Sequence, residues 1–476
     1  MVLHLDAEIT TDDSPRGSLA PAGQLVAPFA PAQIGLDGLP YDPAGGARAS
    51  EASQDQAPGR EAASPHLGPY TSFPAPSPPA ALSALPGQLE LPFDQYDRQH
   101  TMWSVMDPRT QPTEHRRMGK CGKVSLGRGE LAIERGENGT WSPSGFVRCN
   151  TWQCPTCGPR RAHERAALLS AAIAKHRRRD AFHDTWLLTF TIWHHAGETQ
   201  REKFDRLHAA WDTFAKSRQW KRFRERFGVV DVVRCLDETF GRNGVHPHFH
   251  VLLFVEHAVI GFMPIRGLGI DERNELLADV AGEQLIEPWS DAVRETGVWP
   301  VKESVQSAFR KHSVDMRGGD DAATYVVKWG MADEAVMSPR KRFSRTDLLN
   351  LACAGDPVAA QWWREWADAT RGRNFCTGTG KLRERLVLSD EEIQEHREEM
   401  RRRREAEELK QGKEPKPKRP RLRIVISYVD LPTVVRLGWG AIVRAAEHAE
   451  DVGRDPQRLV DHLLMINGPP ARVADG

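Results

Sequence analysis

Residues 246–254 read HPHFHVLLF and decide the fold more than any other stretch of the 476-residue chain. Side chains alternate between the two faces of a β-strand, so His246, His248 and His250 project to one face. The apolar residues between and after them project to the other face. Two imidazoles on one strand face can bind a divalent cation together. The stretch therefore predicts a strand with one apolar face and one metal-binding face.

The preceding segment, VVDVVRCLDETF at 229–240, predicts a second strand, and the turn-forming GRNG joins the two into a hairpin. A third metal ligand is expected from this strand, and Glu238 is the candidate. A loop with an odd number of residues, 241–245, would pair Glu238 with His248 and place the carboxylate on the histidine face. A four-residue loop would turn Glu238 to the other face. A surface strand with incidental histidines, or a structural zinc site, is the alternative interpretation.

Helix and strand patterns alternate on both sides of this hairpin. Apolar residues at three- and four-residue spacing predict helices, and aromatic and β-branched runs followed by turns predict strands. The predicted helices span 160–179, 201–227, 272–297, 320–331, 348–370 and 389–410, and further predicted strands span 186–194 and 300–310. This order predicts an α+β fold in which helices flank a central antiparallel sheet.

The first 95 residues are rich in Pro, Ala and Gly. They carry three of the 65 Lys and Arg residues but eleven of the 65 Asp and Glu residues, which leaves a net charge of +8 for the rest. They lack helix or strand periodicity, so we expect a disordered acidic tail. The chain begins without a basic, apolar leader, and no run approaches the ~20 apolar residues of a membrane helix. A cytoplasmic protein with no membrane partner is therefore expected.

Basic residues cluster at 175–179 (KHRRR) and 216–227 (KSRQWKRFRERF). Both clusters are candidate DNA-contacting surfaces, because grouped Lys and Arg side chains favour phosphate. The second cluster also carries Trp220, Phe223 and Phe227. We expect these aromatic side chains to pack into the core rather than to stack on bases.

Three of the seven cysteines crowd into CNTWQCPTCG at 149–158. In a reducing compartment, Cys149, Cys154 and Cys157 indicate a metal site before a disulfide. Structural Zn²⁺ binds four such ligands tetrahedrally, and Cys121 is the expected fourth, with His163 as an alternative. Incidental thiols are the other interpretation. The remaining cysteines are expected to be packing residues: Cys235, Cys353 and Cys376.

The segment DDAATYVVKWG at 320–330 places Asp321, Tyr325 and Lys328 on one face of a predicted helix, because they lie four and three residues apart. A tyrosine hydroxyl on such a face can attack a DNA phosphate, helped by a divalent ion that polarises the phosphate. Lys328 can neutralise phosphate charge, and Asp321 can act as a base on water. Taken alone the pattern is common, and a packing tyrosine beside a solvated lysine is the alternative.

Together these motifs resemble the HUH endonucleases, and within them the replication initiators of small rolling-circle plasmids, over about residues 115–385. The stretch 186–194 (WLLTFTIWH) is similar to the first motif of the family. The stretch 246–254 is similar to its metal-binding histidine motif, with Glu238 in the acidic position that often precedes it. The stretch 321–329 is similar to its tyrosine motif, which follows the histidine motif here. Relaxases of conjugation usually have the opposite order.

The resemblance implies a five-stranded antiparallel sheet with Mg²⁺ or Mn²⁺ on one face and Tyr325 as the nucleophile. It implies nicking of single-stranded or supercoiled plasmid origin DNA through a 5′-phosphotyrosine, followed by rejoining or release of the strand. It also implies dependence on a host helicase and DNA polymerase. A carboxylate four residues before the tyrosine serves termination in the one-tyrosine branch. Asp321 occupies that position, and Asp320 is the fallback.

Five parts are expected along the chain. They are the tail at 1–95, a Cys-rich zinc-binding segment at 115–165, the nicking domain at 166–345, a helical extension at 346–410, and a basic linker with a small C-terminal unit at 411–476. A mobilisation relaxase is the nearest enzymatic rival. A zinc-ribbon DNA-binding regulator without catalysis, and a metal-dependent hydrolase of small substrates, are rivals from other classes. Both leave Tyr325 without a role.

Overall fold

A computed structural model of the chain describes most residues after position 92. The described ranges are 93–106, 116–127, 130–137, 139–241, 243–260, 263–319, 322–323, 343–410 and 419–468. Residues 1–92 of the predicted tail lie outside them, as does most of the predicted helix at 320–331. No helix among the described residues is both long enough and apolar enough to cross a membrane.

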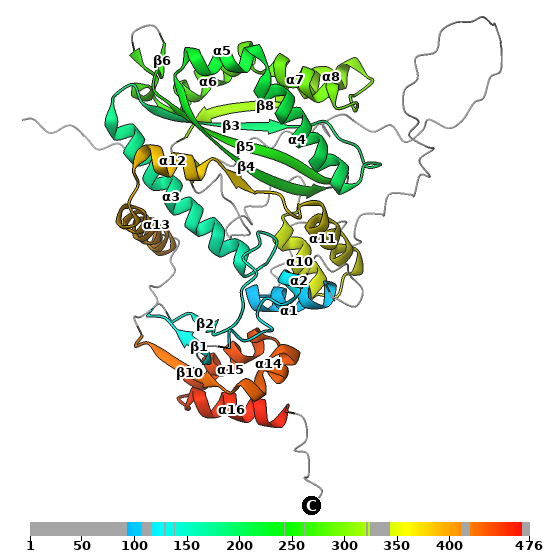
Figure 1. The fold of residues 1–476 in the computed structure, drawn as a ribbon, viewed down its shortest axis with the longest axis vertical. Coiled ribbons are helices and arrows are strands. Elements are labelled where there is room, and N and C mark those ends of the chain that lie inside the picture. Colours follow the sequence, from blue (N-terminus) through cyan, green and yellow to red (C-terminus); the bar gives the residue numbers. More distant parts are fainter. Residues whose placement is uncertain are drawn as a thin grey trace, which may run out of the picture. The chain divides into compact units, whose positions relative to one another are not determined.

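The centre of the fold is a five-stranded sheet in the order β8-β3-β5-β4-β9 (Figure 1), and all neighbouring strands run antiparallel. The strands are β3 (Asp184–Thr191), β4 (Val229–Gly241), β5 (Gly244–Val255), β8 (Val314–Gly318) and β9 (Cys376–Thr377). This sheet and the helices around it confirm the predicted α+β class and the predicted hairpin of strands around GRNG.

The hairpin between β4 and β5 closes more tightly than either loop considered from the sequence. Its last paired residues are Gly241 and Gly244, so the connection is a two-residue turn. Gly244 has φ +79°, a conformation that glycine adopts without a steric penalty. This register pairs Asp237 with His248, and it pairs Glu238 with Pro247.

One face of the sheet is covered by helices that bury a cluster of aromatic rings. Helices α4 (Gln200–Lys216), α5 (Arg218–Arg226) and α7 (Ile286–Glu295) supply it. The Phe190 ring lies 5.1 Å from Phe214 and 4.9 Å from Trp289, measured between centroids. The aromatics of the predicted basic cluster are buried as expected, with exposed fractions of 3%, 1% and 2% for Trp220, Phe223 and Phe227.

Several predicted elements differ in detail. The predicted helix at 201–227 is two helices, because Ser217 leaves the helical conformation and its side chain caps α5. The predicted helix at 272–297 divides at Leu285 into α6 (Ile270–Gln284) and α7. The predicted strand at 300–310 is wrong: these residues begin α8 (Glu303–His312), and the strand is β8. Acidic Glu303 in the first turn and a basic last turn both favour this helix.

Helix α3 (Cys157–Arg179) lies on the other side of the sheet, the side that carries the histidines. The ring of His176 lies 5.3 Å from that of Phe254, and its Nε2 donates a hydrogen bond to the Val255 carbonyl at 3.0 Å. Strand alternation places Phe254 on the same face as His250. Helices α12 (Thr379–Leu386) and α13 (Asp390–Lys410) pack against α3.

A second, three-stranded sheet joins the two ends of the described chain. Its order is β10-β1-β2, formed by β1 (Leu131–Arg135), β2 (Trp141–Ser144) and β10 (Leu422–Ile426). The C-terminal strand therefore completes a sheet that begins in the Cys-rich segment. Three helices follow β10: α14 (Leu431–Leu437), α15 (Trp439–Asp451) and α16 (Pro456–Ile466).

The remaining elements connect these parts. Helix α1 (Gln95–Val105), which the sequence did not predict, begins at Asp94 with a capping box. The predicted helix at 348–370 is interrupted at 354–356 and forms α10 and α11. The other elements are α2 (Arg116–Gly119), β6 (Val259–Ile260), β7 (Met263–Pro264), α10 (Arg345–Cys353), α11 (Pro357–Ala369), and the 3₁₀ turns Ile265–Gly267 and Tyr428–Asp430.

Candidate metal centre

Three side chains from the central hairpin converge on one point. The Asp237 Oδ2 atom lies 3.2 Å from His248 Nε2 and 3.3 Å from His250 Nε2. The donor atoms of all three residues lie within 4.8 Å of one another. Two imidazole nitrogens and a carboxylate oxygen form a donor set that suits a divalent cation. The residues therefore fit the metal that the histidine strand predicts.

The opposite nitrogen of each imidazole is engaged by a neighbouring group. Thr189 Oγ1 lies 3.0 Å from His250 Nδ1, and the His246 carbonyl oxygen lies 3.3 Å from His248 Nδ1. Because these contacts fix the rings, both Nε2 atoms remain directed at the centre. Thr189 belongs to β3, where it stands directly opposite His250. The strand predicted from WLLTFTIWH thus supports the histidine strand from the side.

Asp237 is held as an anion. Burial disfavours its charge, but hydrogen bonds and positive charge from His248 and His250 outweigh burial and hold the pKa of Asp237 well below its usual range. Arg345, at the start of α10, lies 3.4 Å from the Asp237 Oδ1 atom through its Nη2. An ionised carboxylate is the form that binds a cation.

Glu238 does not join this group. The predicted pairing of Glu238 with His248 is wrong, because the two-residue turn shifts the register and places Asp237 opposite His248. The buried Glu238 carboxylate instead forms an ion pair with Arg345, at 3.0 Å between Oε1 and Nε. The carboxylate and the histidines come from adjacent strands, as expected. The carboxylate is that of Asp237, one residue before the predicted Glu238.

His246 lies next to the centre rather than within the group. Its Nδ1 atom lies 2.8 Å from His194 Nε2, just beyond the end of β3. Its ring centroid is 5.8 Å from that of His248. A role for His246 as a metal ligand stays a prediction. The predicted catalytic residues lie outside the described residues: Asp320, Asp321, Tyr325 and Lys328.

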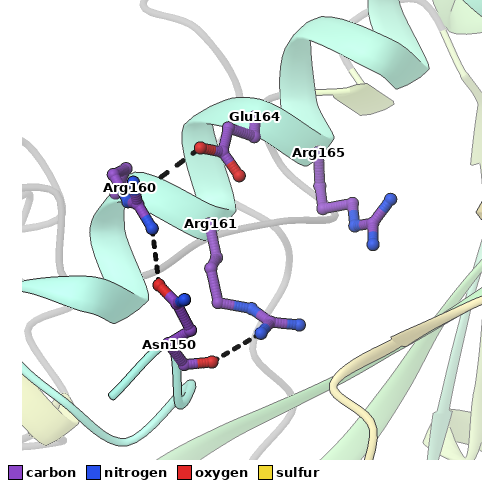
Figure 2. Close-up of a pocket in the computed structure, with 5 residues that line it drawn as sticks. All are labelled: Asn150, Arg160, Arg161, Glu164 and Arg165. Atoms are coloured by element: carbon purple, nitrogen blue, oxygen red, sulfur yellow. Dashed lines mark hydrogen bonds and ion pairs between the residues drawn. The ribbon is translucent and has the colours of Figure 1, made fainter. Parts of the chain in front are cut away.

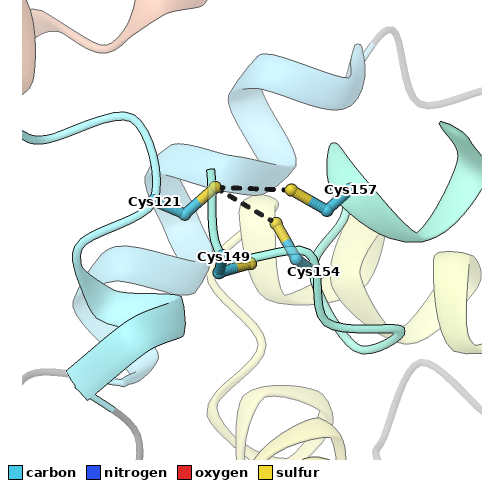
Figure 3. A group of neighbouring side chains, drawn as sticks. All are labelled: Cys121, Cys149, Cys154 and Cys157. Carbon is cyan, nitrogen blue, oxygen red and sulfur yellow. Dashed lines mark hydrogen bonds between the residues drawn. The ribbon is translucent and has the colours of Figure 1, made fainter. Parts of the chain in front are cut away.

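The second candidate site is formed by Cys121, Cys149, Cys154 and Cys157, all buried and all with their sulfur atoms within 4.8 Å of one another (Figure 3). The Cys121 Sγ atom lies 3.6 Å from Cys157 Sγ and 3.7 Å from Cys154 Sγ. A tetrahedral Zn²⁺ with Zn–S bonds of about 2.3 Å needs sulfur atoms about 3.8 Å apart. Hydrogen bonds from Cys121 and the other two thiols lower the pKa of Cys157, which favours a thiolate. The group therefore fits structural zinc.

The local fold explains why Cys121 joins the cluster. Its carbonyl oxygen accepts a hydrogen bond from Trp103 Nε1 at 2.9 Å, and the Gly122 carbonyl accepts one from Trp439 Nε1 at 2.8 Å. Helices α1 and α15 thereby hold the loop after α2 against the start of α3. The alternative ligand, His163, is an exposed residue of α3 and is not among the clustered residues.

Sequence reasoning missed Asp237, Thr189 and Arg345. The two-residue turn was the available signal for Asp237, since Asn-Gly at 243–244 is a strong hairpin turn signal. The positions of Thr189 and Arg345 depend on strand pairing and on the later helix α10, which no local pattern reveals. Cys235 and Cys376 are buried as expected, and Cys353 is half-buried.

Comparison with known proteins relates the chain to replication proteins. Residues 145–260 match the family described as "Replication protein". A protein named "Protein rep" from Streptomyces lividans is 25% identical over 324 residues, which cover 52% of this chain and 66% of that protein. No solved structure matches the chain. Residues 145–260, which contain three of the clustered cysteines and the Asp237–His248–His250 group, are therefore similar to the replication protein family.

Proposed function

We propose that the protein is a plasmid replication initiator that starts rolling-circle replication by nicking single-stranded DNA at the origin. The observation that carries the proposal is the convergence of the Asp237 Oδ2 atom with His248 Nε2 and His250 Nε2 at 3.2 and 3.3 Å. This group lies within the residues that match the replication protein family. A carboxylate beside two imidazoles suits a divalent cation that could act on a phosphate, which supports this proposal over a regulator that only binds DNA.

In the proposed reaction, Asp237, His248 and His250 hold Mg²⁺ or Mn²⁺, which supplies positive charge to the scissile phosphate. The hydroxyl oxygen of Tyr325 attacks the phosphorus atom and its proton passes to solvent or to a nearby base. A tyrosine O–P bond forms while the bond from phosphorus to the 3′ oxygen breaks, leaving a 5′-phosphotyrosine and a free 3′-hydroxyl. Lys328 offsets charge on the phosphate.

The strand is later rejoined when a 3′-hydroxyl attacks the phosphotyrosine. Alternatively it is released when Asp321 accepts a proton from a water that attacks. Origin DNA is the proposed substrate, and a host helicase and DNA polymerase are the proposed partners. Zn²⁺ bound by the four clustered cysteines is proposed to stabilise the segment that precedes the sheet.

Covalent capture tests the proposal directly. Full-length protein is incubated with labelled single-stranded oligonucleotides from the origin of its own element, with Mn²⁺ or with EDTA. Denaturing gels should show a Mn²⁺-dependent protein–DNA adduct, and mass spectrometry should locate it on Tyr325. Tyr325→Phe should abolish the adduct while DNA binding persists, and His248→Ala should abolish cleavage. Tyr428→Phe, at an exposed tyrosine of the C-terminal unit, is the matched control.

The outcomes separate the candidate functions. Tight binding of origin DNA with no adduct at any Mn²⁺ concentration would overturn the proposal in favour of a non-catalytic regulator. An adduct on another residue would overturn the role of Tyr325. Metal-dependent hydrolysis of small phosphoesters without any dependence on DNA would point to a hydrolase. An adduct that forms on transfer-origin DNA and not on replication-origin DNA would indicate a mobilisation relaxase.

A further inference from the structure

A basic pocket of about 260 Å³ lies at the start of helix α3, beside the cysteine-bearing loop that precedes it. Its lining consists of Asn150, Arg160, Arg161, Glu164 and Arg165 (Figure 2). Three guanidinium groups and one carboxylate give it a net charge of +2. Neither the proposed nicking reaction nor the cysteine cluster uses these side chains.

The cysteine-bearing loop orients two of the arginines. Asn150 lies between two of the clustered cysteines and adopts φ +52°, the left-handed conformation. Its side-chain oxygen accepts a hydrogen bond from Arg160 Nη2 at 2.5 Å, and its backbone oxygen accepts one from Arg161 Nη1 at 2.5 Å. Arg165 follows Arg161 by four residues, so both project from the same face of α3 (Figure 2). Asn150 therefore positions Arg160 through its side chain and Arg161 through its backbone.

The charges in the pocket are only partly balanced. Glu164 reaches Arg160 at 4.0 Å, a distance that gives an exposed pair little energy. Burial and the positive charges of its neighbours Arg165 and Arg160 act together to lower the pKa of Arg161, although Glu164 opposes them. A guanidinium nevertheless stays protonated in a protein, so this repulsion persists until an anion enters.

Contacts connect the pocket to the metal centre. The Arg161 guanidinium lies 5.0 Å from the Trp152 ring, and Trp152 stacks on Phe375 at 5.7 Å. Arg345 lies 5.6 Å from the same Phe375 ring and 3.4 Å from the Asp237 carboxylate. Helix α3 itself lies on the histidine side of the sheet, as its contact with β5 shows. This chain of side-chain contacts links the lining of the pocket to the metal centre.

We propose that this pocket binds the backbone phosphates of a single-stranded DNA segment next to the strand cleaved at the metal centre, an inference that rests on the proposed nicking function. Guanidinium groups match phosphate oxygens through paired hydrogen bonds. Trp152 is only 6% exposed and is covered by Arg161, so the pocket offers no ring on which a base can stack. Recognition here is therefore of phosphate, independent of sequence, and it positions the strand.

Salt-dependent binding tests the pocket without relying on cleavage. Full-length protein is titrated into a fluorescein-labelled single-stranded oligonucleotide at 50–300 mM NaCl without Mg²⁺ or Mn²⁺, and affinity is read by anisotropy. Arg160→Gln, Arg161→Gln and Arg165→Gln together should weaken binding about tenfold at low salt. They should also reduce the slope of log affinity against log salt by about 2, as expected for three lost phosphate contacts at ~0.7 each. A duplex of the same sequence should be affected less.

Two further variants make the test specific. Arg401→Gln, Arg402→Gln and Arg403→Gln together remove the same charge from exposed, ion-paired positions of α13 and should leave the slope unchanged. Arg165→Ala alone keeps both Asn150 hydrogen bonds and should still reduce the slope by about 0.7. Zinc content and circular dichroism should be the same in all these variants as in the wild type.

Each outcome decides the proposal. Equal slopes for the pocket triple variant and the wild type, with unchanged covalent capture, would overturn the pocket while leaving nicking intact. If the pocket triple variant shows a reduced slope of log affinity against log salt, but the wild type never forms an adduct, the result would support the pocket and refute nicking. If inorganic phosphate competes at the pocket but the variant binds DNA normally, the site takes a small anion and the proposal fails.

Discussion

Protonation of His176 should loosen the contact between α3 and the central sheet. The ring is fully buried, with 0% exposure, and its Nε2 donates to the Val255 carbonyl. Among the described residues no partner faces its Nδ1, so a second proton there would be a buried charge without an acceptor. Burial, helped by the positive charges of the nearby His183 and Arg385, lowers the pKa of His176 to about 4, while the hydrogen bond to Val255 opposes this shift.

The sign and size of the effect follow from linkage. The folded pKa lies below the ordinary value of about 6.5, so the unfolded chain takes up the proton first as pH falls. The free energy of unfolding contributed by the neutral form of His176 is fully present above pH ~6.5. It is lost progressively as the pH falls toward ~4. Integrating from neutral pH down to pH 5 gives a loss of about 2 kcal/mol.

The assay compares the wild type with His176→Gln, whose amide can still donate to the Val255 carbonyl but cannot titrate. Hydrogen exchange by mass spectrometry would give the opening free energy of β5 peptides at pH 7 and pH 5, corrected for intrinsic rates. The wild type should lose about 2 kcal/mol more than the variant over this interval, because all other titrating groups are shared. Equal losses in the two proteins would refute the reasoning.

Two predictions concern the metal sites. Asp237→Asn should weaken Mn²⁺ binding in calorimetry by more than about 100-fold, since losing even an outer partner costs about 10–100-fold. Glu238→Gln should instead lower thermal stability through Arg345 and leave Mn²⁺ affinity nearly unchanged, and the reverse pattern would contradict the observed register. Wild-type protein should carry zinc by elemental analysis and lose it in Cys121→Ser but not in Cys353→Ser; full zinc in Cys121→Ser would exclude that thiolate as a ligand.

The sequence predicts the central hairpin well because its signals are local. Alternation in HPHFHVLLF and the turn residues before it are sufficient to expect two antiparallel strands with histidines on one face. The facing of Glu238 depended on the length of the turn, which was expected to be four or five residues although Asn-Gly at 243–244 signals a two-residue turn, and one residue of register moves a side chain to the other face. The structure therefore places Asp237 rather than Glu238 beside the two histidines, on the hairpin where the site was expected.

Elements that depend on distant contacts were harder to predict. The breaks at Ser217 and Leu285 divide segments whose apolar spacing continues across both halves, so periodicity alone reads each as one helix. Helix α8 was mistaken for a strand because it is short and buries little apart from Phe309. No local sequence pattern in either segment predicts the pairing of β10 with β1, because tertiary packing decides it.

That pairing has a consequence for how the protein is made. Arg135 of β1 donates a hydrogen bond to the Pro420 carbonyl, 285 residues further along the chain, and also forms an ion pair with Glu450. During synthesis at about 5–20 residues per second, β1 emerges from the ribosome many seconds before β10 exists. Its outer edge has no strand to pair with throughout that time. The Cys-rich segment must therefore wait for the last part of the chain, and a nascent protein halted after α13 presents an open edge to any strand nearby.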